Sequence, residues 1–133
     1  MTDGEKANAL SDYVMRDSSF KRVYEAYEPY MTSIARIQAA RPAAHMVVVC
    51  EQWCGDCRRL VPRMARILEH LPGWSAELLP WKGKTRQQPY QVKAIPTFII
   101  YPDAQEGRVE IGRIVESTTH PTLEDDLLDI VTG

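Results

Sequence analysis

The segment 46–57 reads MVVVCEQWCGDC, and it decides the fold of this chain. Its first part, Met46 to Cys50, is short, nearly all apolar and rich in β-branched residues, which is typical of a buried strand. The segment ends in two cysteines separated by two residues, and an amphipathic helix is predicted from about Cys57 to His70. We therefore expect the cysteine pair at the junction between a buried strand and a helix.

The two cysteines of this junction have different expected environments. Cys54 lies at the helix start, where unpaired backbone N–H groups and the positive end of the helix dipole stabilise a thiolate. We expect its pKa to fall below the free value of about 8.5, to about 7. Cys57 lies one turn into the helix and should stay protonated. These positions predict that Cys54 attacks a disulfide and that Cys57 resolves the mixed disulfide.

The sequence pattern after residue 57 predicts an α/β fold. We expect strands around 76–79, 96–101 and 108–115, a short helix over 85–92, and a last helix from Thr119 or His120 with Pro121 in its first turn. A strand–helix–strand unit implies parallel pairing, and the last two strands form an antiparallel hairpin. Together they predict a mixed β-sheet with helices on its faces.

Residues 1–41 are predicted to be helical. Apolar residues recur there at steps of three and four: Phe20, Val23, Tyr27, Met31 and Ile34. Asp17 and the two serines after it offer N-caps, and Pro29 is expected to kink or divide the stretch because it lacks an amide donor.

These motifs resemble the thioredoxin superfamily, and in particular small cytosolic thioredoxin-like proteins with a WCGDC motif. The Trp-Cys-x-x-Cys sequence follows a hydrophobic strand, and Pro62 stands where the family's active-site helix carries a proline. The tripeptide 95–97, Ile-Pro-Thr, is similar to the family's cis-proline signature, and Gly112 matches a glycine of its last strand. The resemblance covers about 44–132.

The resemblance implies one thioredoxin-like domain over residues 1–133. Its core is 44–132, and 1–41 is a helical N-terminal extension that replaces the family's usual first strand. The turn at Pro96 is expected to pack against the two sulfurs and to present the backbone of Ile95 to an extended substrate. Trp53 and Ile95 would supply an apolar rim. The alternative for Pro96 is that it simply starts an edge strand.

The chain departs from the family at two places. Between the cysteines it carries Gly55-Asp56, and the Asp56 carboxylate raises a neighbouring thiol pKa while Arg58 and Arg59 oppose it, so the net sign stays open. Where the family has a buried Asp, this chain has a valine at position 48. Glu51 is the nearest carboxylate and either acts through a water molecule or is a solvated surface residue.

Two further features have a bland and a sharper interpretation. The helix after Cys54 carries four arginines: Arg58, Arg59, Arg63 and Arg66. They either attract an anionic partner, such as glutathione, or form a solvated helix face, and we favour the solvated face. Cys50 is either a small buried hydrophobe, which is favoured, or a third redox thiol.

Composition limits the function classes. A chain of 133 residues fits one domain, and the net charge of −2 gives no general attraction for nucleic acid or anionic membrane. No apolar run is long enough to span a bilayer, and the polar N-terminus does not resemble a secretory signal. Three cysteines are too few for a disulfide scaffold, so we expect a cytoplasmic protein in a reducing compartment.

We therefore expect a thiol–disulfide oxidoreductase that reduces protein disulfides through Cys54 and Cys57. It should need no cofactor and no metal, and a reductase or a small thiol would supply its electrons. One alternative is a redox-sensing interaction protein whose disulfide switches partner binding. A metal-binding module using Cys50 with the pair is the other alternative, but the three histidines lack a paired metal spacing: His45, His70 and His120.

Overall fold

A four-stranded mixed β-sheet forms the centre of the molecule. The computed structural model describes residues 9–105 and 107–133. The strands are β1 (Ala44–Val49), β2 (Trp74–Leu79), β3 (Thr97–Tyr101) and β4 (Gly112–Val115), in the order β2-β1-β3-β4. β1 is parallel to β2 and antiparallel to β3, and β3 is antiparallel to β4. The predicted α/β fold with a mixed sheet is confirmed.

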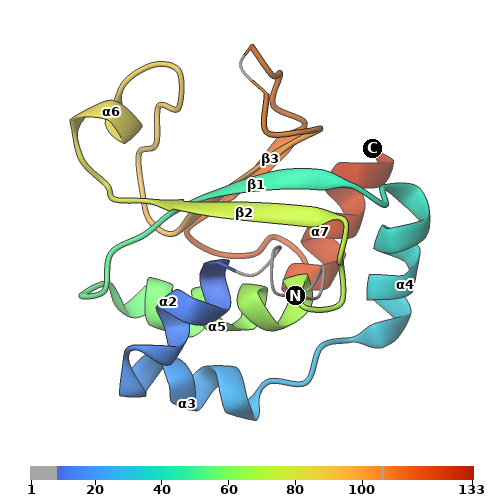
Figure 1. Cartoon of the computed structure of the whole chain (residues 1–133), viewed down its shortest axis with the longest axis horizontal. Helices are drawn as coiled ribbons and strands as arrows, with labels where there is room; N and C mark the ends of the chain where they lie inside the picture. The colour runs from blue at the N-terminus through green and yellow to red at the C-terminus, as the bar shows by residue number, and fades with distance from the viewer. Residues whose placement is uncertain (1–8, 106) are drawn as a thin grey trace.

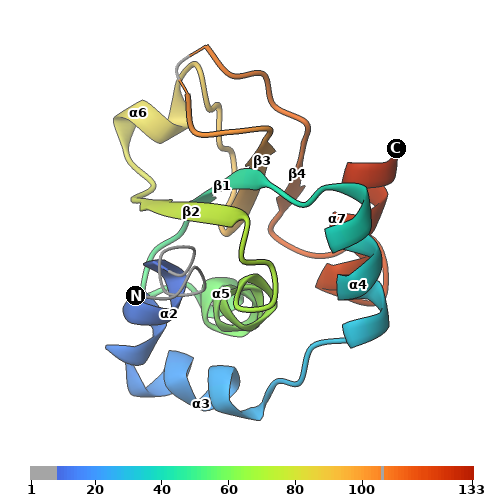
Figure 2. The same cartoon turned by 45° about the vertical axis from the view of Figure 1, so that its right-hand side comes forward.

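Helix α5 (Gly55–Leu68) connects β1 to β2 and covers one face of the sheet (Figure 2). Its apolar stripe is buried, as the periodicity predicts, and each large aliphatic side chain there contributes about 1.5–3 kcal/mol. β1 is buried along its whole length, which matches its continuous apolar sequence. The strand and the helix therefore hold the turn between them, residues 50–54, against a rigid core.

Within the described residues, three helices precede the sheet: α2 (Ala9–Met15), α3 (Ser18–Ala26) and α4 (Met31–Ala40). Figures 1 and 2 show α3 on the side of α5 that faces away from the sheet, with α2 beside it. Helical structure is thus confirmed for the described part of 1–41, while residues 1–8 lie outside the described residues. The Asp17 carboxylate caps α3 by accepting from the Ser19 and Phe20 amides at 2.8 and 3.1 Å.

The expected division of this region at Pro29 is confirmed, but the apolar face predicted from the periodicity is wrong at Met31. The chain leaves the helical conformation between α3 and α4, around Pro29. Phe20, before the break, and Ile34, after it, are both buried, but Met31 is 52% exposed. Pro29 divides the stretch into two helices with separate partners, because α3 packs on α5 and α4 packs on α7.

Helix α7 (Leu123–Thr132) begins later than predicted. The Thr122 hydroxyl accepts a hydrogen bond from the Asp125 amide at 3.0 Å, so Thr122 is the N-cap. The Asp126 carboxylate accepts from the Thr119 and His120 amides at 2.9 and 2.8 Å. These bonds fix the preceding residues as a loop, and Pro121 lies there instead of in the first turn.

The predicted helix over 85–92 is also wrong. Only α6 (Gly83–Arg86) forms. Pro89 lacks an amide donor, and Gln91 has a φ of 49°, which is outside the helical range. The Val92 amide donates to the Thr85 carbonyl at 2.8 Å and closes the segment as a loop. Strand β4 is likewise shorter than the predicted 108–115.

A buried carboxylate joins the N-terminal helices to α7. Glu124 is 0% exposed. Its carboxylate accepts from the Tyr27 hydroxyl at 2.7 and 2.8 Å and from the Tyr30 amide at 2.8 Å. We call this group, Tyr27, Tyr30 and Glu124, the Glu124 junction. It ties the connection between α3 and α4 to the last helix.

None of the helices within the described residues has the length and apolarity required to cross a membrane.

Candidate active site

The two motif cysteines occupy different positions at the start of α5. Cys54 is the N-cap residue with extended backbone angles, and its carbonyl accepts from the Arg58 amide at 3.1 Å. Cys54 is half-buried, whereas Cys57, in the first helical turn, is 0% exposed. All three cysteines of the chain are free thiols. The pair therefore consists of one reachable thiol and one thiol behind it.

The pKa of the Cys54 thiol is raised, which overturns the expected lowering. Burial is the largest cause, because it disfavours the charged thiolate. The backbone amides of Cys57 and Asp56 act in the opposite direction, as expected at a helix N-terminus, but they do not outweigh burial. In the dithiol state, Cys54 is a thiol at neutral pH.

Cys57 lies between two other thiols. Hydrogen bonding to the Cys50 thiol and burial raise the pKa of Cys57 far above that of a free cysteine. A hydrogen bond with Cys54 and a backbone bond from Glu51 lower the pKa but do not reverse the shift. As the sequence predicts, Cys57 stays protonated in this state.

The turn before β3 faces Cys54. The peptide bond between Ile95 and Pro96 is cis, and the Cys54 thiol donates to the Ile95 carbonyl at 3.7 Å. β3 lies between β1 and β4, so Pro96 precedes an inner strand, and the edge-strand alternative is wrong. The turn therefore brings a backbone acceptor to the reachable thiol.

The apolar rim predicted beside this turn is only half correct. Trp53 is 66% exposed, which makes a large apolar surface next to Cys54. Ile95 is only 6% exposed, because its side chain belongs to the core. Ile95 therefore contributes its carbonyl group, and Trp53 contributes the exposed apolar surface.

Glu51 is anchored to the end of β2. Its carboxylate accepts from the Trp81 amide at 3.0 Å, and the neighbouring Cys50 amide donates to the Leu79 carbonyl at 3.3 Å. The sequence did not identify Trp81 as a neighbour. Parallel pairing of β1 with β2 gives the reason, because it brings the ends of both strands to one edge. Val48, at the position of the family's buried Asp, is fully buried between β2 and β3.

The other predicted tuning residues lie on the exposed side of the motif. Asp56 forms an ion pair with Arg59 at 3.2 Å, and Arg58 donates from Nε to the Gln52 carbonyl at 3.1 Å. Gly55 is exposed, and a Cβ there would meet nothing within 4 Å. Asp56 and Arg59 thus neutralise each other close to Cys54, with Arg58 holding the turn.

The N-terminal helices reach the active-site turn, which the sequence did not predict. Gln52 donates from its amide nitrogen to Asp17 at 2.6 Å. Tyr13, on α2, shares a side-chain hydrogen bond with Cys50. No local pattern links these residues, since about 35 positions separate each pair. Tyr13 and Asp17 therefore belong to the surroundings of the site.

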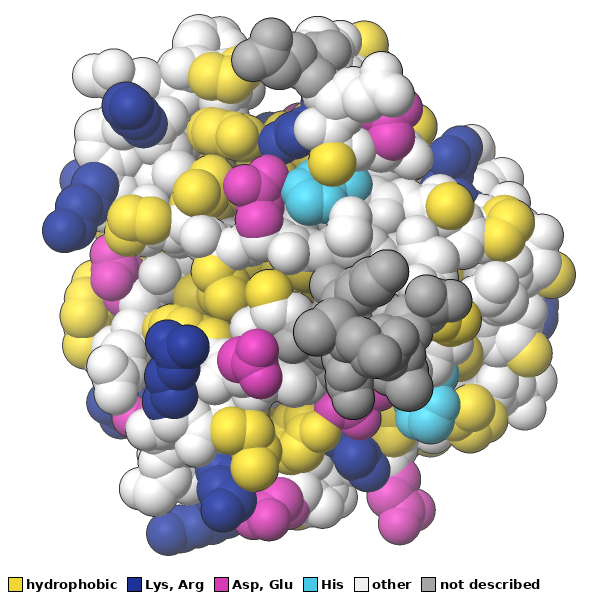
Figure 3. Space-filling view, viewed as in Figure 1, with side chains coloured by type: hydrophobic (Ala, Val, Ile, Leu, Met, Phe, Trp, Pro, Cys, Tyr) yellow, Lys and Arg dark blue, Asp and Glu magenta, His cyan; other side chains and the backbone are white. Residues whose placement is uncertain are grey.

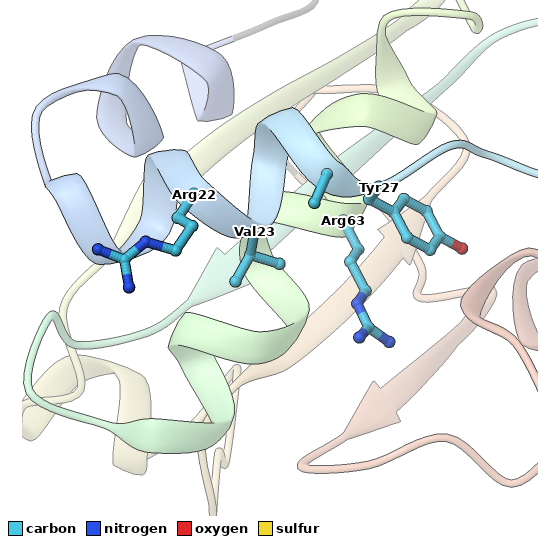
Figure 4. A pocket seen from close by; sticks show the side chains of 5 residues that line it. Arg22, Val23, Tyr27 and Arg63 are labelled. Atoms are coloured by element: carbon cyan, nitrogen blue, oxygen red, sulfur yellow. The ribbon is translucent and has the colours of Figure 1, made fainter.

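Two of the four arginines of the cluster lie against tyrosines at α3 and its C-terminal end, so the favoured prediction of a solvated helix face is wrong for these two. Arg58 and Arg59 are exposed, but Arg63 and Arg66 lie over the rings of Tyr27 and Tyr24 at 5.3 and 5.1 Å. Figure 4 shows a pocket beside Arg63 with a volume of about 260 Å³. None of the residues that line it belongs to the cysteine motif; they are Arg22, Val23, Ala26, Tyr27 and Arg63.

A larger cavity, of about 490 Å³, opens beside α6. Its lining combines apolar side chains with lysines: Leu79, Pro80, Lys82, Gly83, Lys84, Thr85 and Tyr90. Figure 3 shows basic and hydrophobic side chains next to one another over α6. The lining begins at the end of β2, which is hydrogen-bonded to residues 50 and 51, so the cavity adjoins the active-site turn.

Within residues 9–105 and 107–133, no group of three or more His, Cys, Asp or Glu side chains is arranged to hold a metal ion.

A mixed sheet, a Cys-x-x-Cys pair at the junction of β1 and α5, and a cis-proline turn facing the first cysteine define the thioredoxin-like class. The model of the thioredoxin family matches residues 5–119, and the chain belongs to this family. At the level of class, it is a thiol–disulfide oxidoreductase. The match begins at residue 5, so it includes the helices that we expected to lie outside the resemblance, and it ends before α7.

Similar proteins agree with this membership. Thioredoxin 1 of Nostoc sp. and thioredoxin 1 of Synechococcus elongatus are each 29% identical over 80 residues, covering 56% of this chain and 72% of theirs. Two solved structures share the fold. A protein of unknown function from Pseudomonas aeruginosa has a TM-score of 0.62 at 19% identity, covering 92% of this chain and 82% of its own. An HIV epitope-scaffold has a TM-score of 0.60 at 17% identity, covering 98% and 87%.

Proposed function

We propose that this protein reduces disulfide bonds of other proteins through the Cys54 and Cys57 dithiol. The observation that carries the proposal is the arrangement around Cys54: a half-buried thiol 3.7 Å from the Ile95 carbonyl, with the buried Cys57 thiol hydrogen-bonded behind it. A substrate disulfide can approach only Cys54, and only Cys57 is placed to release the product.

The reaction has two exchange steps. Cys54 loses its proton to solvent, and the thiolate attacks one substrate sulfur, so that a mixed disulfide forms and the other substrate sulfur leaves as a thiolate. Cys57 then loses its proton and attacks the Cys54 sulfur. The Cys54–Cys57 disulfide forms, the bond from Cys54 to the substrate breaks, and the second substrate thiolate takes up a proton. The substrate gains two electrons and the protein loses two.

Protein substrates fit the surface around Cys54 better than a small molecule does. The exposed Trp53 ring offers apolar contact, and the Ile95 carbonyl lies at the reacting thiol, where an extended substrate backbone would pair. The proposed partners are disulfide-containing proteins in the cytoplasm, with a reductase or a small thiol as the electron donor. The hydrogen bond between the Trp81 amide and Glu51 holds the turn in place, and the Glu51 carboxylate would receive the Cys57 proton through water.

The test is the reduction of insulin disulfides with dithiothreitol as the donor. The wild type should accelerate the reaction, the Cys54→Ser variant should not, and Cys50→Ser should retain the acceleration. If the wild type gives no acceleration, turnover is excluded and the redox-sensing alternative takes its place. Circular dichroism of each variant controls for folding.

A further inference from the structure

We propose that Cys50 is a third redox-active thiol, and that the oxidised protein exchanges between a Cys54–Cys57 disulfide and a Cys50–Cys57 disulfide. The inference rests on the proposed function only in its first step, the oxidation of Cys54 and Cys57. It assigns to Cys50 a role beyond that of a small core residue.

The positions of the three thiols carry this inference. Cys50 directly follows β1, and its amide is fixed to the Leu79 carbonyl at 3.3 Å. Cys57 lies in the first turn of α5, and the thiols of Cys50 and Cys54 both influence its pKa through side-chain interactions. Cys50 and Cys57 are 5% and 0% exposed and belong to the same core cluster. Cys57 is thus the thiol that neighbours both of the thiols with which it can pair.

The exchange needs no external oxidant. Starting from the Cys54–Cys57 disulfide, Cys50 loses its proton and its thiolate attacks the Cys57 sulfur. The Cys50–Cys57 bond forms, the Cys54–Cys57 bond breaks, and Cys54 leaves as a thiolate that takes up a proton. The number of disulfides stays at one, so the step is an isomerisation. The oxidising equivalents enter at the reachable thiol and end between two buried thiols.

Tyr13 is placed to assist this step as a positioning residue. Its hydroxyl shares a hydrogen bond with Cys50, and it comes from α2, which packs against α5 and β2. Through this hydrogen bond the hydroxyl holds the attacking sulfur of Cys50 in position. The N-terminal helices therefore acquire a chemical role through Tyr13.

The isomer with the Cys50–Cys57 disulfide leaves Cys54 as a single free thiol. Cys54 keeps its position beside the Ile95 carbonyl, but the thiol that would release a bound partner is occupied. In this isomer the Cys54 thiolate can attack the disulfide of a small molecule or of a protein, so that a mixed disulfide forms and the second sulfur of that disulfide leaves as a thiolate, and Cys57 cannot resolve the mixed disulfide. We infer that this form holds its partner instead of turning it over.

Disulfide mapping of the full chain tests the inference. The protein is oxidised with one equivalent of diamide, quenched in acid to stop exchange, and alkylated at its one remaining free thiol. Trypsin alone leaves the three cysteines on one peptide, residues 37–58, because it does not cleave the bond between Arg41 and Pro42, so cleavage at Glu51 and Asp56 is added to separate them. Alkylated Cys54 in a resolvable fraction supports the inference. Alkylation confined to Cys50 overturns it.

Variants make the test independent of the exchange rate. In Cys54→Ser, diamide should convert the two remaining thiols into an internal disulfide, whereas in Cys57→Ser the remaining pair, Cys50 and Cys54, should stay reduced or link two chains. Serine is a good N-cap, so Cys54→Ser keeps the helix start intact. Two free thiols in oxidised Cys54→Ser overturn the inference.

Tyr13→Phe separates the role of the hydroxyl from that of the ring. The exchange should slow about tenfold, because a hydrogen bond to a charged sulfur is lost, while insulin reduction through Cys54 and Cys57 should be retained. An unchanged exchange rate removes Tyr13 from the proposal. Failure of insulin reduction with intact Cys50–Cys57 pairing would instead refute the proposed function and leave this inference standing.

Discussion

The active-site turn and the Glu124 junction both place polar groups against the core, but they differ in how far apart these groups lie in the sequence and in how exposed they are. The turn gathers its reactive groups from one short stretch, Glu51 to Cys57, and leaves Trp53 exposed and Cys54 half-buried. The junction joins residues 94 and 97 positions apart and buries its carboxylate completely.

This difference separates chemistry from stability. A thiol at the N-cap has a weak hydrogen bond at 3.7 Å to the Ile95 carbonyl, so its replacement disturbs little of the fold. The Glu124 carboxylate is fully buried and accepts from two donors, and hydrogen bonds to charged groups contribute about 1.5–3 kcal/mol each. We therefore expect substitutions in the two regions to have opposite effects on activity and on stability.

The largest expected effect is the loss of disulfide reduction in Cys54→Ser without a loss of stability. The nucleophile is absent, but serine caps a helix at least as well as cysteine does. The free energy of unfolding in urea, measured under reducing conditions, should change by less than about 0.5 kcal/mol. A large destabilisation would show that the turn supports the fold as the junction does.

Glu124→Ala should give the reverse result. The Tyr27 hydroxyl and the Tyr30 amide lose their acceptor, and the free energy of unfolding should fall by about 2–4 kcal/mol. Activity per folded molecule should be unchanged. Glu28→Ala is the matched control, because Glu28 is an exposed carboxylate on the same connection. Equal urea midpoints for the two variants would remove the distinction between the regions.

The pH dependence of Cys54 is the next effect in size. Because burial raises its pKa, the thiolate fraction should rise about tenfold per pH unit from neutral pH and continue to rise above pH 8.5, the ordinary range of a cysteine. The rate of alkylation by iodoacetamide, resolved to the peptide that carries Cys54, measures this profile. A plateau at pH 7 would mean that the helix N-terminus outweighs burial.

The smallest expected effect is that of Asp56→Asn. Removing a like charge should lower the pKa of Cys54 and raise its alkylation rate at pH 7, but by less than about threefold, because Asp56 is paired with Arg59 and partly solvated. Asp103→Asn, in an exposed loop after β3, is the control. A tenfold effect would identify Asp56 as a main determinant of Cys54 reactivity.

The sequence predicted the turn better than the junction for a physical reason. Apolar periodicity and the spacing of Cys54 and Cys57 are local signals, so the sheet, α5 and the unequal exposure of the two thiols could be predicted. The raised pKa of Cys54 could not, because burial depends on every element packed around the sulfur. Nor could the contacts of Tyr13 and Trp81, which depend on pairing between distant segments.

The error in the predicted start of the last helix also arose from contacts between residues that are not adjacent in the sequence. The predicted start of the last helix at Thr119 or His120 relied on the favourable position of a proline in a first turn. Asp126 holds the amides of those residues in a loop instead, and Thr122 caps the helix. A side chain several positions downstream thus decided where the helix begins.

The position of Glu124 also bears on what constitutes a folding unit here. The family match ends at residue 119, but the acceptor for Tyr27 and Tyr30 lies beyond it, on α7, which also covers α4. A fragment cut at the end of the match would uncover the apolar side of α4 and remove the carboxylate that accepts from Tyr27 and Tyr30. The smallest piece of this chain able to fold on its own therefore has to extend through α7.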